Sequence, residues 1–134
     1  AVGLAVIEEI ESGNLIEESN RKGKILKDNL NKLKDDSNGR ISHVLGEGLI
    51  SAILFKDPEI GKADGLIASK IAERCYEKGL LVVHTGRESI KLGPPLTITD
   101  EALLEGINVI IESFNEVSKE LWIQKIMTQS QRIT

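Results

Sequence analysis

The sequence predicts an α+β fold in which a small antiparallel or mixed sheet of three to four strands carries helices packed on one face. Three observations point to this fold. Four segments repeat apolar residues at helical spacing, and four shorter apolar segments bounded by turn-forming residues lie between them. The elements follow one another as helix, helix, strand, strand, helix, strand, strand, helix. A chain of 134 residues with 40% apolar and 28% charged residues is expected to form one globular domain.

Two helices are expected before the first strand. Residues 2–10 repeat apolar side chains at helical spacing, and Gly13 and Asn14 interrupt the pattern. Asn14 is predicted to cap a second helix through its side chain, with Glu17 completing a variant of the capping box. The second helix is expected to continue to about Lys34. Its buried stripe is predicted to contain Ile25, Leu26, Leu30 and Leu33.

The middle of the chain predicts two strands and a third helix. Residues 41–45 alternate loosely, and residues 49–55 are almost entirely apolar, which predicts a buried central strand. Residues 56–64 are rich in turn-forming types and are expected to be an exposed loop. The third helix is expected over residues 65–78, with Gly79 at the position after a helix where glycine is favoured.

The last part of the domain predicts two strands and a long helix. Residues 80–84 and 89–93 are expected to be strands joined by a turn, and the two prolines that follow end the second strand because proline cannot donate to a sheet ladder. Thr99 or Asp100 is expected to cap the final helix. Its apolar face is predicted to contain Leu103, Leu104, Ile107, Ile110, Ile111, Phe114 and Val117.

A change in composition suggests where the domain ends. Residues 1–119 are predicted to form the domain, with residues 1–36 as the helices that lead into it. Residues 120–134 hold the only tryptophan and the only methionine and end in a polar stretch. This tail is either an extension atypical of the domain, a stretch added by cloning, or the frayed end of the last helix.

Composition and charge argue against several classes of function. The net charge of −4 argues against a nucleic-acid partner, and the one basic stretch, residues 22–28, spaces its charges as a solvated helix face does. No run of 18 apolar residues is present, so no membrane-spanning helix is expected. Cys75 is the only cysteine, which rules out an internal disulfide and favours a reducing, cytoplasmic location.

Four blocks of sequence resemble the C-terminal small domain of class III aminotransferases, which are fold type I enzymes that use pyridoxal 5'-phosphate (PLP). The blocks are AVGLAVIEEIESGNLIEESNRKGKIL, VLGEGLISAILF, CYEKGLLV and IKLGPPLTITDEALLEGINVI. They are similar to the family's entry helices, its V-R-G-x-G-L strand entry, its C-x-x-x-G-L-L segment and its L-R-x-x-P-P-L-x-I-T junction. They occur in the family's order over about residues 1–118. Ornithine, acetylornithine and 4-aminobutyrate aminotransferases share this pattern, as do dialkylglycine decarboxylase and some amino-acid racemases.

The resemblance implies a transferase that moves an amino group between an amine or amino acid and a 2-keto acid, with PLP as electron sink. By this alignment the Schiff-base lysine and the phosphate-binding groups lie in a large domain N-terminal to Ala1. The chain is therefore expected to be a fragment that contains no catalytic, cofactor-binding or metal-binding residue and is inactive alone. The full-length enzyme is expected to be a cytoplasmic homodimer.

The resemblance also implies a substrate-binding position at Lys91. The family usually has an arginine there, before the Pro-Pro-Leu, whose guanidinium holds the substrate carboxylate with two parallel bonds. Lys91 departs from this pattern because an ammonium is a point charge and lacks that fork. Arg87, in the preceding turn, is the second candidate because it could assist Lys91. The competing interpretation is that Lys91 is a surface strand lysine and Arg87 an ordinary turn residue.

Other residues are expected to have structural roles. Gly46 and Gly48 lack the third glycine and the following helix of a phosphate-binding loop, so they are expected to permit a bulge or a close backbone approach. Leu45 stands where the family often has arginine, which removes a polar role there. His43 and His84 have no acidic partner at ligand spacing, so no metal site is expected.

A catalytic role is not expected for the remaining nucleophilic residues. Ser89 and Thr85 lie near His84 but have no accompanying oxyanion signal, and Cys75 is expected to be a small core residue. The alternative to an aminotransferase fragment is a freestanding α+β binding or regulatory module without chemistry.

Overall fold

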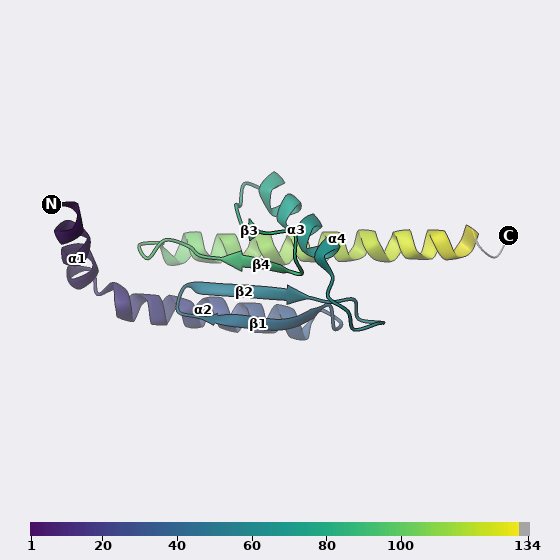
Figure 1. The fold of residues 1–134 in the computed structure, drawn as a ribbon, viewed down its shortest axis with the longest axis horizontal. Coiled ribbons are helices and arrows are strands. Elements are labelled where there is room, and N and C mark those ends of the chain that lie inside the picture. Colours follow the sequence, from purple (N-terminus) through teal and green to yellow (C-terminus); the bar gives the residue numbers. More distant parts are fainter. Residues whose placement is uncertain (132–134) are drawn as a thin grey trace.

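The computed structural model describes residues 1–131, which form four helices and one four-stranded sheet (Figure 1). The helices are α1 (Val2–Ser12), α2 (Leu15–Asp35), α3 (Gly65–Glu77) and α4 (Asp100–Gln131). The strands are β1 (Ile41–Glu47), β2 (Ile50–Phe55), β3 (Val83–His84) and β4 (Ser89–Leu92). The strand order is β1-β2-β4-β3, and each neighbouring pair is antiparallel. The predicted α+β fold is confirmed, and the sheet is antiparallel rather than mixed.

Three helices cover one face of the sheet. Alternate residues of β2 point into the core, so Ile53 and Phe55 are buried while Ile50 is 73% exposed. The strand predicted from this apolar run is central in the sheet, as expected. It is buried on only one face, because the other face of the sheet is uncovered. The core is aliphatic apart from one stacked pair, Phe55 and Phe114. Its fully buried members from the helices and β4 include Leu30, Ile67, Ile71, Ile90 and Val117.

The predicted strand over residues 80–84 is mostly wrong, because only Val83–His84 pairs with β4. Continuing the register would place Val82 opposite Leu92 and Leu80 opposite Pro94. Proline has no N–H to donate, and the backbone N–H of Leu80 already donates to the carbonyl of Cys75 at the end of α3. The ladder therefore ends where its partner strand ends.

The predicted side-chain cap of α2 is also wrong. Asn14 does occupy the N-cap position, but its backbone is left-handed, with φ of 49°, and its side chain makes no capping hydrogen bond. Its amide Nδ2 instead donates to Glu17 Oε2 at 2.7 Å. The tight turn from α1 sets this backbone conformation, which asparagine tolerates better than most residues.

The other helix ends agree with the sequence prediction. The hydroxyl of Thr99 accepts a hydrogen bond from the backbone N–H of Ala102, so Thr99 rather than Asp100 caps α4. Gly79 adopts a φ of +85° after α3, the left-handed conformation that glycine permits at this position. Helix α4 passes through residues 119 and 120 without interruption and extends past the other elements in Figure 1. Residues 132–134 of the predicted tail lie outside the described residues.

Ion pairs on the surface join the helices of this layer. The guanidinium of Arg74 on α3 contacts Glu116 and Glu120 of α4, and Lys78 contacts Glu112 and Glu116. Hydrogen bonds from Lys78 and then Arg74 lower the pKa of Glu116. Exposed ion pairs of this kind each contribute little to the free energy of unfolding. Apolar packing establishes the contact between α3 and α4, and the ion pairs add to it.

Candidate functional site

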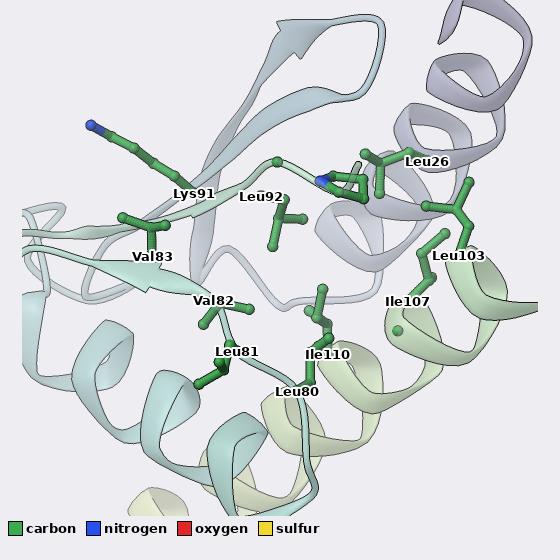
Figure 2. A pocket seen from close by; sticks show the side chains of 13 residues that line it. Leu26, Leu80, Leu81, Val82, Val83, Lys91, Leu92, Leu103, Ile107 and Ile110 are labelled. Atoms are coloured by element: carbon green, nitrogen blue, oxygen red, sulfur yellow. The ribbon is translucent and has the colours of Figure 1, made fainter. Parts of the chain in front are cut away.

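Lys91 lies on the face of the sheet opposite the helices. In the register of the sheet, Leu45, Ala52, Lys91 and Val83 form one row across all four strands. Lys91 is the only charged residue of this row, and its neighbours Leu45 and Val83 are 51% and 56% exposed. Figure 2 shows its amino group pointing away from the core side chains, while Leu92 points toward them.

The charge of Lys91 has no counter-charge within the described part of the chain. No hydrogen bond or ion pair involves its side chain within residues 1–131. Arg21, Lys24, Arg74, Lys78 and Lys125 each contact a carboxylate, whereas Lys91 and other surface lysines such as Lys32 and Lys70 do not within residues 1–131. The ammonium of Lys91 is therefore available to an anionic group of a ligand.

The segment after Lys91 is held in place by α2. Lys22, on α2, is 7% exposed, and its Nζ donates to the backbone carbonyl of Ile98 at 2.6 Å. One residue earlier, Arg21 forms two hydrogen bonds with the carboxylate of Asp100, at 2.9 and 2.7 Å. Two neighbouring cations of α2 thus fix the loop that joins β4 to α4. They do so together with the two prolines of this loop, whose φ angles are restricted.

A cavity of about 170 Å³ lies behind the end of β4, between the strand and helices α2 and α4. It is lined mainly by apolar side chains, among them Leu26, Leu80, Val82, Leu92, Ile107 and Ile110. Lys91 contributes to its wall, but its amino group points away from it (Figure 2). The cavity therefore offers apolar contacts and no charged group.

Gly106→Ala, at the wall of this cavity, is expected to stabilise the domain by about 0.5–1 kcal/mol because alanine is the better helix former. A Cβ there would lie 3.5 Å from Leu80 Cδ1, an ordinary contact distance, and would fill part of the cavity. Urea unfolding should show a higher midpoint with an unchanged slope. A lower midpoint would mean that this helix position tolerates no side chain.

Arg87 lies in the turn between β3 and β4. It belongs to the bend at residues 86–88, before β4 begins at Ser89, whereas Lys91 lies within the strand. The Arg87 side chain is 78% exposed, and its Nε is 3.7 Å from Glu88 Oε2. The guanidinium of Arg87 therefore has a carboxylate nearby, whereas the ammonium of Lys91 has none within residues 1–131.

His84 takes part in a contact that the sequence did not suggest. Its Nε2 is 2.8 Å from the hydroxyl of Ser69 on α3, and its Nδ1 is 3.2 Å from the backbone carbonyl of Ser89. Because a carbonyl can only accept, Nδ1 carries the proton and donates to Ser89. The pair ties α3 to β3, and its partner is Ser69 rather than the Thr85 or Ser89 hydroxyl weighed from the sequence.

The remaining candidate residues are separated. His43 is exposed on the open face of the sheet, whereas His84 contacts α3 on the helix-covered face. No group of three or more metal-ligating side chains occurs among residues 1–131. Cys75 is fully buried in the core, as predicted, and burial raises the pKa of its thiol.

Sequence reasoning missed Lys22 and Ser69. Lys22 lies four residues before Leu26, on the buried stripe of α2, and a lysine at such a position was a signal that its ammonium has a buried partner. No comparable signal identified Ser69, because it lies 15 residues before His84. Only the tertiary fold brings α3 against β3.

Comparisons with known proteins agree on one family. The family model for class III aminotransferases matches residues 1–114. Mitochondrial acetylornithine aminotransferase of Candida glabrata is 35% identical over 117 residues, which cover 87% of this chain and 25% of that protein. Leucine/methionine racemase of Thermococcus litoralis is 34% identical over 117 residues, or 87% of this chain and 26% of that protein.

The solved structures include a transaminase from the marine bacterium Virgibacillus, with a TM-score of 0.79 and 28% identity over 90% of this chain and 28% of that one. The chain spans about a quarter of the length of the curated relatives it matches. Fold, family model and relatives all point to the same group, and the chain therefore belongs to the class III aminotransferase family.

Proposed function

We propose that this chain is the C-terminal portion of a PLP-dependent class III aminotransferase, and that it holds the carboxylate of an amino-acid or keto-acid substrate through Lys91. The complete enzyme moves an amino group between an amine or amino acid and a 2-keto acid. The observation that carries the proposal is the position of Lys91, an unpaired cation on the uncovered sheet face beside Ala52 and Val83 in the described part of the chain.

The geometry around Lys91 favours an anion that approaches from the open face. The residues paired with Lys91 on its two neighbouring strands, Ala52 and Val83, are apolar, so they add no charge beside it in the row. A single charge-assisted hydrogen bond to a carboxylate is stronger than a neutral one. The single ammonium of Lys91 fixes the orientation of a carboxylate less specifically than the two parallel bonds of an arginine would. This suits a substrate whose acid group is held by more than one element of the enzyme.

Arg87 remains a second candidate with a smaller role. Its exposed guanidinium, in the turn before β4, lies near the carboxylate of Glu88, so it is less available to a substrate anion than the ammonium of Lys91. We therefore assign the carboxylate to Lys91 and expect Arg87 to contribute weakly.

The residues of this chain do not fit a PLP site. Lys22 is the buried lysine, but its Nζ is engaged by the carbonyl of Ile98 and lies 3.6 Å from Glu18 Oε2. The Nζ of Lys91 is free, but its row partners Leu45, Ala52 and Val83 offer no side-chain donor for a phosphate. Family membership implies PLP in the full-length enzymes. We propose that the cofactor is held by the part of the enzyme outside this chain, and that the chain alone is inactive.

Several properties of the complete enzyme follow as proposals. It is a homodimer in which a large N-terminal domain, not present in this chain, lies against the open face of the sheet. Residues 1–119 are the small domain and residues 120–134 an extension.

A cytoplasmic location remains a prediction from the single cysteine, and no helix among the described residues is long and apolar enough to cross a membrane. The alternative, a freestanding binding module, has no support in the family match.

Amino transfer by the complete enzyme tests the proposed function. Incubating it with one amino acid at a time should release the matching 2-keto acid in an amount equal to the enzyme, and adding a second 2-keto acid should restart turnover. Keto-acid release can be followed by mass spectrometry. Racemisation of the amino acid without any keto acid would overturn transamination while leaving family membership intact.

A further inference from the structure

A polar hollow of about 330 Å³ lies between α2 and the β1–β2 hairpin, on the helix-covered side of the sheet. From α2 it is lined by Asn20, Gly23, Lys24 and Lys27, which follow the i, i+3, i+4, i+7 pattern of one helix face. The hairpin supplies the rest of the wall, including Ser51. The proposed function uses none of these residues.

The hollow exists because small residues meet at this place. Gly46 and Ser51 are paired in the register of β1 and β2. Ser51 is buried under the helix layer while the next residue along β2, Ile50, is exposed on the other face. Gly23 of α2 lies close to the backbone of Gly48 and has no side chain to fill the space. The floor of the hollow is therefore the backbone of Gly46 and the side chain of Ser51.

The hydroxyl of Ser51 lacks a hydrogen-bond partner within residues 1–131, although the residue is only 4% exposed. Ser37 is buried to a similar degree, but its hydroxyl donates to the carbonyl of Lys34 and accepts from the N–H of Ile41. A buried hydroxyl without a partner lowers the stability of a fold. Because Ser51 lines the hollow, a ligand bound there can supply the missing partner.

Two lysines give the hollow a positive rim. Lys27 is exposed, and its ammonium contacts no carboxylate in the part of the chain that the structure describes. Lys24 forms an ion pair with Asp28, but the two side chains are 77% and 61% exposed. Such an exposed pair is weak, and an ammonium has three donors, so Lys24 can also donate to a ligand.

The one carboxylate next to the hollow points elsewhere. Glu47 contributes to the wall, but it is paired with Ile50, whose side chain is 73% exposed. Paired residues share a face of the sheet, so the carboxylate of Glu47 leaves the sheet on the face opposite Ser51. Asn20 adds an amide donor from α2. The hollow therefore presents a hydroxyl, an amide and two ammonium groups, which are all donors to an anion.

We propose that this hollow binds a phosphate group. The hydroxyl of Ser51 and the amide of Asn20 donate to its oxygens, and Lys24 and Lys27 balance its charge. A phosphate accepts hydrogen bonds through oxygens on several sides, which matches donors that come from both α2 and the hairpin, whereas the two oxygens of a carboxylate would use fewer of them. Because both lysines are exposed, we expect a dissociation constant of about 1 mM.

Titration of the 134-residue chain with inorganic phosphate, against sodium chloride at equal ionic strength, tests the proposal by nuclear magnetic resonance. The backbone amides of the hairpin and the side-chain amide of Asn20 should shift with phosphate and saturate. Ser51→Ala should weaken binding about tenfold or more, because it removes a hydrogen bond to a charged group. Lys27→Ala should weaken it about two- to fivefold. Lys32→Ala removes an exposed lysine of α2 outside the hollow and should change nothing.

Urea unfolding separates a ligand-binding role of Ser51 from a structural one. Without phosphate, Ser51→Ala should unfold at an equal or higher midpoint, because it removes a buried hydroxyl that has no partner. Phosphate should raise the midpoint of the wild type more than that of the variant, since the general stabilising effect of phosphate acts on both chains. A lower midpoint of Ser51→Ala without phosphate would show that the fold already uses this hydroxyl, and the proposal would fail.

Glycerol 3-phosphate distinguishes the two sources of a phosphate group. Tighter binding of this ester than of inorganic phosphate assigns the hollow to a phosphorylated organic molecule, and equal binding assigns it to free phosphate. The chain spans about a quarter of the length of its relatives, so calorimetry on the complete enzyme, with PLP bound to fill its own phosphate site, repeats the comparison. If wild type and Ser51→Ala bind phosphate equally in either protein, the hollow is not a phosphate site.

Discussion

Gly23→Ala is expected to destabilise the domain by about 3 kcal/mol or more, because the added methyl group would meet main chain in the turn between β1 and β2. A Cβ at residue 23 would lie 2.3–2.5 Å from the backbone of Gly48, closer than any real contact, and the obstacle is main chain rather than a flexible side chain. Overpacking in well-packed regions typically costs about 1–3 kcal/mol, and a backbone clash lies at or above the top of that range.

Gly48 cannot easily move to make room. It adopts a φ of +55° in the turn between β1 and β2, and a side chain there would meet the hydroxyl of Ser19 at 2.7 Å. Gly46, two residues earlier, has a φ of +137° and faces the carbonyl of Ile50. Gly23 and Gly48 therefore let α2 and the β1–β2 turn pack backbone to backbone, and Gly46 permits a close approach to β2, which confirms the close approach predicted for Gly46 and Gly48.

Urea unfolding followed by circular dichroism measures the effect of Gly23→Ala. Gly3→Ala on α1 is the control, because nothing lies within 4 Å of a Cβ at residue 3, and it should be neutral or slightly stabilising. A Gly23→Ala chain with an unfolding midpoint equal to that of the wild type would show that α2 does not approach the turn this closely.

Lys91→Ala in the complete enzyme is expected to lower kcat/KM for carboxylate-bearing substrates by roughly 10- to 150-fold. This corresponds to the loss of one charged hydrogen bond, worth about 1.5–3 kcal/mol. Amines without a carboxylate should be affected much less, because they make no use of this cation. Lys91→Arg should also change kcat/KM, because a guanidinium differs from an ammonium in reach and geometry.

Steady-state kinetics with paired substrates, one with and one without a carboxylate, measures the effect of Lys91→Ala. Arg87→Ala is the matched control, because it removes an exposed cation from the turn before β4 and is expected to have a smaller effect. If Lys91→Ala leaves every substrate within about twofold of the wild type, Lys91 is a surface lysine and the site assignment fails.

Local patterns in the sequence were sufficient for much of the fold. The 3.6-residue repeat located all four helices, and Leu26, Leu30 and Leu33 of the predicted stripe are buried, while Ile25 is only partly buried. The short apolar run of residues 49–55 identified the central strand β2, which begins one residue later than predicted. These features depend on side chains close in sequence, so periodicity alone reveals them.

The features that the sequence did not reveal depend on tertiary contacts. The pairing of Lys91 with Ala52 and Val83 requires the register of three strands, and a shift of one residue would have placed Lys91 in the core. The shortening of β3 depends on where β4 ends. The left-handed backbone of Asn14 follows from the angle between α1 and α2, and the burial of Lys22 depends on a carbonyl 76 residues later.

Borohydride reduction of the complete enzyme in the presence of PLP, followed by peptide mapping, tests most directly the claim that this chain holds substrate and not cofactor. Reduction fixes PLP to the lysine that carries it. We predict one pyridoxyl-lysine per subunit, located outside these 134 residues, and no stoichiometric label when the 134-residue chain is treated alone. A single fully labelled lysine within this chain, together with aminotransferase turnover by the chain, would contradict the account.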